Sequence, residues 1–158
     1  MSRFHVASVA VPYTHSLRVA LSLKDGKLRV LQVVRVAMRA PAAPPSPPAK
    51  EQSGFWFEVR DAQGELLYHR PLPHPVIDSI EVFEDPKGGS IRRVPTKRAE
   101  VKFDLILPDL PQATEFTVYG AGRDADLRKP STVLERRSMS SLREGARAQS
   151  GRPEPDSK

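Results

Sequence analysis

The residues best suited to metal chemistry are His69, His74 and Asp78, which follow one another through a proline-rich stretch. Two imidazoles and a carboxylate form a ligand set that zinc accepts, so this trio is the candidate centre of a metal-dependent hydrolase. Its spacing does not place the ligands on one face of a helix, and no second ligand pair supports it. The simpler interpretation is two histidines in loops or at strand ends, and we expect neither a metal nor another cofactor.

Other catalytic patterns are missing from the chain. Asp61, Gln63 and Glu65 surround Gly64 as in part of a calcium loop, but the distal bidentate glutamate is lacking. A hairpin turn accounts for these residues. The chain has no cysteine, which excludes a disulfide, a thiolate zinc site and a cysteine nucleophile. No Gly-x-Ser-x-Gly elbow or phosphate-binding loop occurs either, so we expect a protein without enzymatic activity.

An aromatic run gives the first candidate binding residues. In a strand over Phe55, Trp56 and Phe57, the two phenylalanines face the core and Trp56 faces outward. An exposed tryptophan is a typical protein-binding anchor. The interpretation that we favour is that Trp56 packs beneath a proline-rich loop at residues 40–48. Tyr68, on the expected return strand, joins Trp56 as a candidate protein-binding residue.

A second candidate is a basic segment between Gly89 and Ala99. Its cations could grip phosphates, but no aromatic stacking platform accompanies them. We interpret the segment as a solvated strand edge that discourages pairing with other chains. Arg92 and Arg93 are kept as candidate protein-binding residues, and a nucleic-acid accessory role remains an alternative. The basic residues of the segment are Arg92, Arg93, Lys97 and Arg98.

Alternating apolar and polar residues indicate the strands that must position these side chains. Asp25-Gly26 predicts a tight hairpin turn between the first two clear strands, since type I′ turns need positive φ. Within the second of these strands the apolar residues switch from one face to the other, which predicts a bulge or burial on both faces near Leu31–Val34. A less regular strand precedes them within residues 4–11. The expected strands are 17–23, 28–36, 55–60, 65–70, 76–84, 90–94, 99–107 and 116–119.

These short strands predict an all-β fold, an antiparallel β-sandwich of seven to eight strands, with a small β-barrel as the alternative. Residues 1–120 form the expected domain. The 16 prolines of the 158 residues gather partly at 41–53, which we interpret as a surface loop. Residues 121–158 read as a disordered basic tail. Thr132 and Glu135 fit a capping box, so a short helix near 132–144 is the one ordered element that the tail permits.

The run from Gly54 to Gly120 resembles bacterial immunoglobulin-like or fibronectin type III-like sandwich domains. The likeness rests on the hairpin pattern of Phe55 to Tyr68 and on the strand and stop of Val101 to Pro111. The Cys-Trp-Cys core of immunoglobulin domains is absent. The resemblance therefore implies a fold, and it assigns no functional residue.

Charge and hydropathy complete the prediction. The net charge of +6 is concentrated at the two ends of the chain, while residues 54–120 are acidic. No apolar run spans a bilayer and the first residues do not fit a signal peptide, so we expect a cytoplasmic location. We predict a non-catalytic protein-interaction or structural module that docks to a larger protein assembly. The alternatives are a metal-dependent or other hydrolase that uses His69, His74 and Asp78, and a nucleic-acid accessory protein that binds through the basic tail and residues 92–98.

Overall fold

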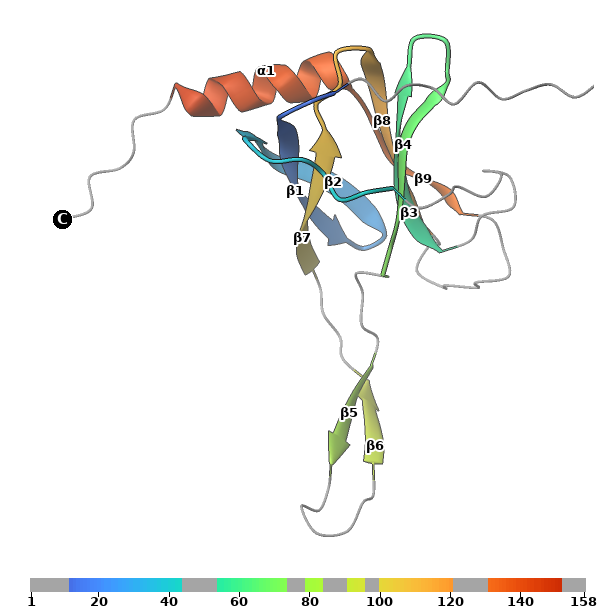
Figure 1. The fold of residues 1–158 in the computed structure, drawn as a ribbon. Coiled ribbons are helices and arrows are strands. Elements are labelled where there is room, and N and C mark those ends of the chain that lie inside the picture. Colours follow the sequence, from blue (N-terminus) through green and yellow to red (C-terminus); the bar gives the residue numbers. More distant parts are fainter. Residues whose placement is uncertain are drawn as a thin grey trace, which may run out of the picture.

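The computed structural model describes residues 12–43, 54–73, 79–83, 91–95, 100–120 and 131–151. Most of these residues are in antiparallel strands, and the predicted β-sandwich is confirmed (Figure 1). The elements are β1 (Ser16–Lys24), β2 (Lys27–Val36), β3 (Phe55–Asp61), β4 (Leu66–Leu72), β5 (Ser79–Phe83), β6 (Ile91–Pro95), β7 (Glu100–Pro108), β8 (Ala113–Gly120), β9 (Thr132–Ser138) and α1 (Met139–Ser150).

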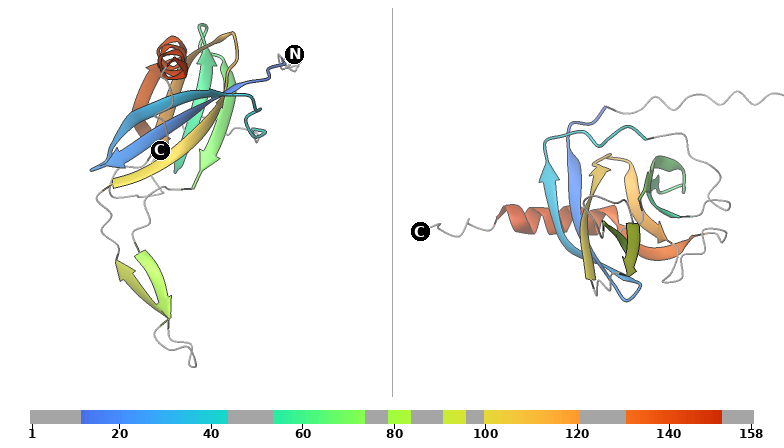
Figure 2. Two further views of the ribbon diagram at one scale, coloured as in Figure 1. Left: turned by 90° about the vertical axis from the view of Figure 1, so that its left-hand side faces the viewer. Right: turned by 90° about the horizontal axis from the view of Figure 1, so that it is seen from below.

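Two separate antiparallel sheets make up the sandwich. One has the strand order β2-β1-β7 and the other the order β4-β3-β8-β9. The two sheets face each other, as two views at right angles show (Figure 2). Because no strand ladder joins the two sheets among the described residues, the fold is a sandwich and not the alternative barrel. The buried apolar residues of both inner faces form one core cluster between them.

The first hairpin follows the sequence closely. Asp25 and Gly26 have φ of 51° and 72°, the positive values that a type I′ turn needs. Across the hairpin, Ala20 is opposite Gln32 but Leu21 is opposite Val30. Leu31 is therefore the extra residue of a bulge, which confirms the irregularity predicted there. Its side chain is 48% exposed.

The β3–β4 turn explains the calcium-like residues. The side chain of Asp61 accepts hydrogen bonds from the backbone N–H groups of Gln63 and Glu65, both at 2.9 Å. Gly64 has φ of 81°, a left-handed conformation that glycine adopts without steric cost. The predicted hairpin turn with a left-handed glycine is confirmed.

Residues 132–150, which we predicted to lie in a disordered tail, instead form β9 and α1. β9 is the edge strand beside β8. The predicted capping box is wrong, because Thr132 and Glu135 lie in that strand. The helix begins at Met139, and the side chain of its N-cap Ser138 accepts a hydrogen bond from the N–H of Ser141 at 3.2 Å. The tail segments 121–130 and 152–158 lie outside the described residues.

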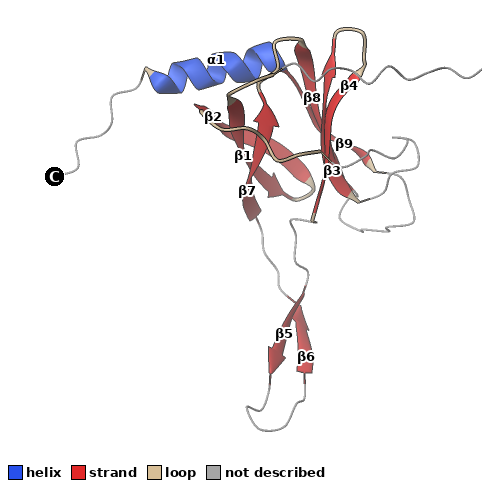
Figure 3. Cartoon of the chain, in the orientation of Figure 1, coloured by secondary structure: helices blue, strands red, loops and turns tan. Residues whose placement is uncertain are grey.

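Tertiary packing explains why α1 is ordered although its sequence predicted a disordered tail. Met139, Leu142 and Ala146 lie on one face of α1 and are at most 3% exposed. The helix contacts β1 and β2 of one sheet and β8 and β9 of the other. It therefore covers the side of the sandwich where the two sheets meet (Figure 3). These three apolar side chains are enough to hold the helix against the sandwich, although the average composition of the segment is polar.

β5 and β6 form a third, two-stranded sheet of their own. In this hairpin Glu81 is opposite Arg93 and Val82 is opposite Arg92. Figure 1 and the left-hand view of Figure 2 show the hairpin extending away from the sandwich. The predicted strands at 76–84 and 90–94 are confirmed with shorter or shifted bounds. The strand expected within residues 4–11 and residues 44–53 of the proline-rich loop lie outside the described residues.

Candidate functional site

Trp56 is buried, with 1% of its surface exposed, although β3 turns it away from the core. Its indole stacks on the ring of Tyr119, with 3.9 Å between ring centroids and 8° between planes. The imidazole of His69 lies on its other side in β4, 5.2 Å away between centroids. Neighbouring strands thus cover Trp56, and it does not form the exposed anchor that we weighed. The proline-rich residues 44–48 that we expected above it lie outside the described residues.

A carboxylate is buried on the same outer face of the sheet. Glu58 is 2% exposed and accepts two hydrogen bonds from the guanidinium of Arg60, at 2.6 and 3.0 Å. The hydroxyl of Tyr119 donates to Glu58 at 3.0 Å. The hydrogen bond to Glu58 raises the pKa of the Arg60 guanidinium above its usual range. The outer-face cluster therefore consists of Trp56, Glu58, Arg60, His69 and Tyr119.

His69 is the one residue of the predicted metal trio that the structure describes. It is 3% exposed and lies opposite Glu58 in the β3–β4 ladder. Burial lowers the pKa of its imidazole, and the charge of Glu58 offsets part of that effect. His74 and Asp78 lie outside the described residues. Within the described ranges no three metal-ligating side chains come together, and the hydrolase stays a prediction.

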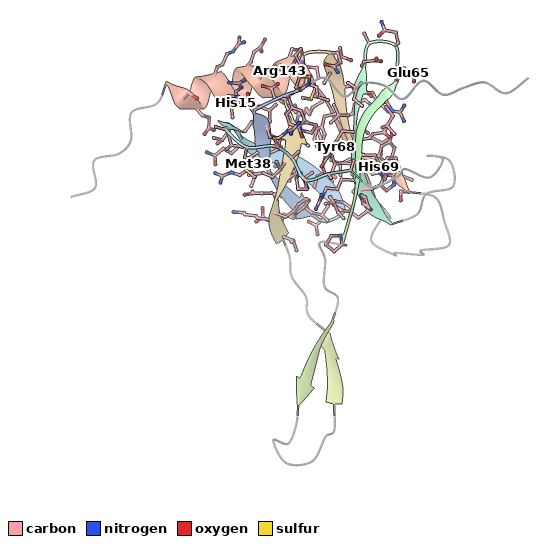
Figure 4. The ribbon with its side chains drawn as sticks, viewed as in Figure 1. His15, Met38, Glu65, Tyr68, His69 and Arg143 are labelled. Carbon is pink, nitrogen blue, oxygen red and sulfur yellow. The ribbon has the colours of Figure 1, made fainter. Side chains whose placement is uncertain are left out.

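Tyr68 faces the opposite side of the sheet from Trp56. It is 7% exposed, belongs to the core cluster and packs against Phe57, with 5.7 Å between ring centroids. Its hydroxyl donates to the carbonyl of Pro41 at 2.7 Å. Burial raises the pKa of Tyr68. Figure 4 shows Tyr68 and His69 as neighbours on β4. Tyr68 thus links the chain segment after β2, at Pro41, to the core through this hydrogen bond.

Arg92 and Arg93 lie on β6, in the hairpin that extends from the sandwich. Lys97 and Arg98 lie outside the described residues. The four residues predicted to bind a protein therefore do not form one surface. Trp56 and Tyr68 are buried on two faces of one sheet, while Arg92 and Arg93 belong to a separate element.

Sequence reasoning missed a second charged cluster at the end of β7. One oxygen of Asp109 accepts a hydrogen bond from Arg35 of β2 and the other accepts one from Arg143 of α1, both at 2.9 Å. Burial alone would raise the pKa of Asp109, but the hydrogen bonds from the two arginines outweigh it and lower the pKa. These three residues are far apart in the chain, and the one local signal is a lone aspartate after a predicted strand.

Among the described residues, no helix is both long and apolar enough to cross a membrane. The immunoglobulin-like or fibronectin type III-like assignment within the sandwich class stays a prediction. No protein-family model, no curated protein and no solved structure matches this chain.

Proposed function

We propose that this chain is a non-catalytic module that docks to a larger protein, and that the β5–β6 hairpin is its docking element. The observation that carries the proposal is that these two strands form a sheet of their own, away from the sandwich. An isolated two-stranded hairpin is marginally stable in water and gains stability from a third strand or from a packing surface. A docking partner supplies either of these.

The backbone of the hairpin favours strand addition as the mode of docking. Among the described residues, β5 pairs with β6 and each has one side without a neighbouring strand. Such an edge presents N–H and C=O groups to a strand of another protein. Backbone hydrogen bonds would then give affinity, and alternate side chains would give specificity.

The composition of the hairpin supports a protein partner. Five of its ten strand residues are isoleucine, valine or phenylalanine, which is more apolar than a solvated extension requires. Glu81, Arg92 and Arg93 add both signs of charge. A nucleic-acid partner would favour positive charge together with stacking aromatics. A mixed apolar and charged pattern is typical of protein interfaces.

Site-specific photocrosslinking tests this proposal in the full chain. A photoreactive phenylalanine analogue replaces Phe83 in the hairpin or, as the control, the exposed Leu31 of the sandwich. In the native host we expect a light-dependent adduct with one reproducible protein from position 83 and none from position 31. No adduct at 83, or the same adduct from both positions, contradicts the proposal. An adduct that nuclease removes supports the nucleic-acid alternative instead.

Hydrogen exchange measured with the captured partner sharpens the test. The backbone amides of residues 79–83 and 91–95 should exchange rapidly in the free protein, because a lone hairpin opens often. They should become protected when the partner binds. If new protection appears in the edge strands β2 or β4 instead, the partner binds the sandwich and the hairpin is not the docking element.

A further inference from the structure

A hollow of about 650 Å³ lies beside α1 and is lined by three arginines. Arg35 comes from β2, and Arg143 and Arg147 come from successive turns of the helix. Leu17 and Ala146, both buried, contribute apolar surface to the same hollow. Figure 4 marks Arg143 where the helix meets the sandwich. The hollow is separate from both the outer-face cluster and the hairpin.

The charges around the hollow do not cancel. Among the described residues of the lining, Asp109 is the one carboxylate, and it faces three guanidiniums. Each of its oxygens already accepts an arginine hydrogen bond. Two positive charges are therefore left without a counter-charge in the lining. The nearby C-terminal end of the helix contributes only about half an elementary negative charge, which does not neutralise them.

Donors remain available as well as charge. Arg143 is largely occupied, because it also donates to the carbonyls of Leu110 and Ala113, at 2.6 and 3.4 Å. In contrast, Arg35 uses only its Nε, in the bond to Asp109. Arg147 is exposed and makes no hydrogen bond or ion pair within the described part of the chain. Most N–H donors of Arg35 and Arg147 are thus free to bind a ligand.

We propose that this hollow binds a phosphate dianion, either inorganic phosphate or the phosphate group of a phosphorylated ligand. A dianion balances the two uncompensated charges, whereas a single carboxylate leaves one of them. Guanidinium groups bind phosphate oxygens in pairs of parallel hydrogen bonds, which is why arginine recurs in phosphate sites. In a purely structural role, Arg147 would complement the helix C-terminus and Arg35 would pair with Asp109, but that role leaves most N–H donors of both arginines unused.

Titration of the full chain with inorganic phosphate, followed by NMR at constant ionic strength, tests the proposal. We expect saturable shifts at residues 35 and 143–150. Arg147→Gln and Arg35→Gln should each weaken phosphate binding about tenfold, the cost of one charge-assisted contact. Arg29→Gln, an exposed arginine on the same strand as Arg35, is the matched control and should leave binding unchanged.

The outcomes separate specific from general anion binding. Equal shifts in the three variants, or the same shifts with sodium chloride, overturn the proposal. Arg147 is exposed, so its variant remains informative even if Arg35→Gln disturbs the fold through Asp109. A phosphoserine peptide that binds at least about tenfold more tightly than phosphate assigns a phosphorylated protein segment as the ligand. Equal affinities assign the free ion, and the unphosphorylated peptide is the control.

Discussion

The two faces of β3 are equally buried but by different chemistry. On the inner face, Phe57 and Val59 are fully buried among the apolar residues of the core. On the outer face, Trp56 and Glu58 are 1% and 2% exposed, yet they lie in a network of stacked rings and charged hydrogen bonds. The inner face is held by contacts without preferred direction, whereas the outer face depends on the orientation of a few polar atoms.

This difference shows that the burial of a strand face does not reveal which interactions fill it. Alternation along a strand assigns residues to faces, but it does not say whether a face is wet, apolar or filled by a polar network. A buried carboxylate is stable only when it is paired and hydrogen-bonded. Arg60 and Tyr119 provide those bonds for Glu58. Three substitutions and one pH titration test the comparison, from the largest expected effect to the smallest.

Phe57→Ala should produce the largest loss of stability, because it leaves a cavity in the inner face. Phe57 packs against Phe116 and Tyr68, with 5.9 and 5.7 Å between ring centroids. We expect the free energy of unfolding to fall by about 3–5 kcal/mol in urea denaturation. Leu66→Ala, at a residue that is 38% exposed, is the control and should cost far less. Equal losses would show that the core does not lie on this face.

Glu58→Gln should come second, because it replaces a carboxylate that accepts three hydrogen bonds. Hydrogen bonds to charged groups contribute about 1.5–3 kcal/mol, and we expect a loss in that range. Glu65→Gln, in the exposed turn, changes charge equally and should have little effect. The double variant Glu58→Gln/Arg60→Gln should lose less free energy of unfolding than the sum of the losses of the two single variants. Strict additivity in urea denaturation would argue against a coupled network.

Tyr119→Phe isolates one hydrogen bond of the outer face. It removes the donor to Glu58 and keeps the ring stacked on Trp56. Thermal and urea unfolding should show a loss of about 1 kcal/mol. Tyr13→Phe is the matched control, because its hydroxyl lies 3.5 Å from the carbonyl oxygen of Ala40 and forms a weak bond. If both variants lose the same stability, the hydrogen bond to Glu58 contributes no more to the free energy of unfolding than the weak bond of Tyr13.

Acidification should affect the outer face through His69. Because burial lowers the pKa of His69 in the folded state, the unfolded chain binds the proton more readily. The stability contributed by neutral His69 is full above the unfolded value of about 6.5 and is lost as pH falls toward the lower folded pKa. The effect is the smallest of the four, since Glu58 offsets part of the shift.

Fluorescence measures this titration, because Trp56 is the only tryptophan of the chain and its ring lies 5.2 Å from the imidazole. An imidazolium quenches a neighbouring indole. We expect a quenching step with a midpoint below 6.5 that disappears in His69→Gln. A midpoint above that value, or a step that survives the substitution, would contradict the assigned environment of His69.

Local patterns were sufficient to predict most of the sandwich. The strands were predicted from alternation within a few residues, and Asp25-Gly26 predicted a turn that depends on the conformation of two residues. The bulge at Leu31 was also visible, because the apolar positions change face within one strand. Each of these features is decided by neighbours in the chain, which is the information that a single sequence contains.

The remaining features depend on partners that are distant in the chain. α1 is held by three buried side chains on one of its faces, whereas the polar composition predicted a disordered tail with at most a short helix near 132–144. Asp109 joins Arg35 to Arg143, and no local pattern connects these positions. Likewise, Trp56 was placed on the outer face correctly, but its cover by Tyr119 requires the pairing of β3 with β8.

The pairing of distant strands also bears on how the chain is synthesised. β1 completes its ladder only with β7, where Leu17 pairs with Leu107. A ribosome that adds about 5–20 residues per second needs roughly 5–20 s to cover that interval. During this time the edge of β1 that β7 later pairs with stays open, and the apolar face of the β1–β2 hairpin is uncovered. Translation therefore leaves a window in which the nascent chain is exposed to chaperones and to misassembly, and that window closes only after β9 and α1 emerge.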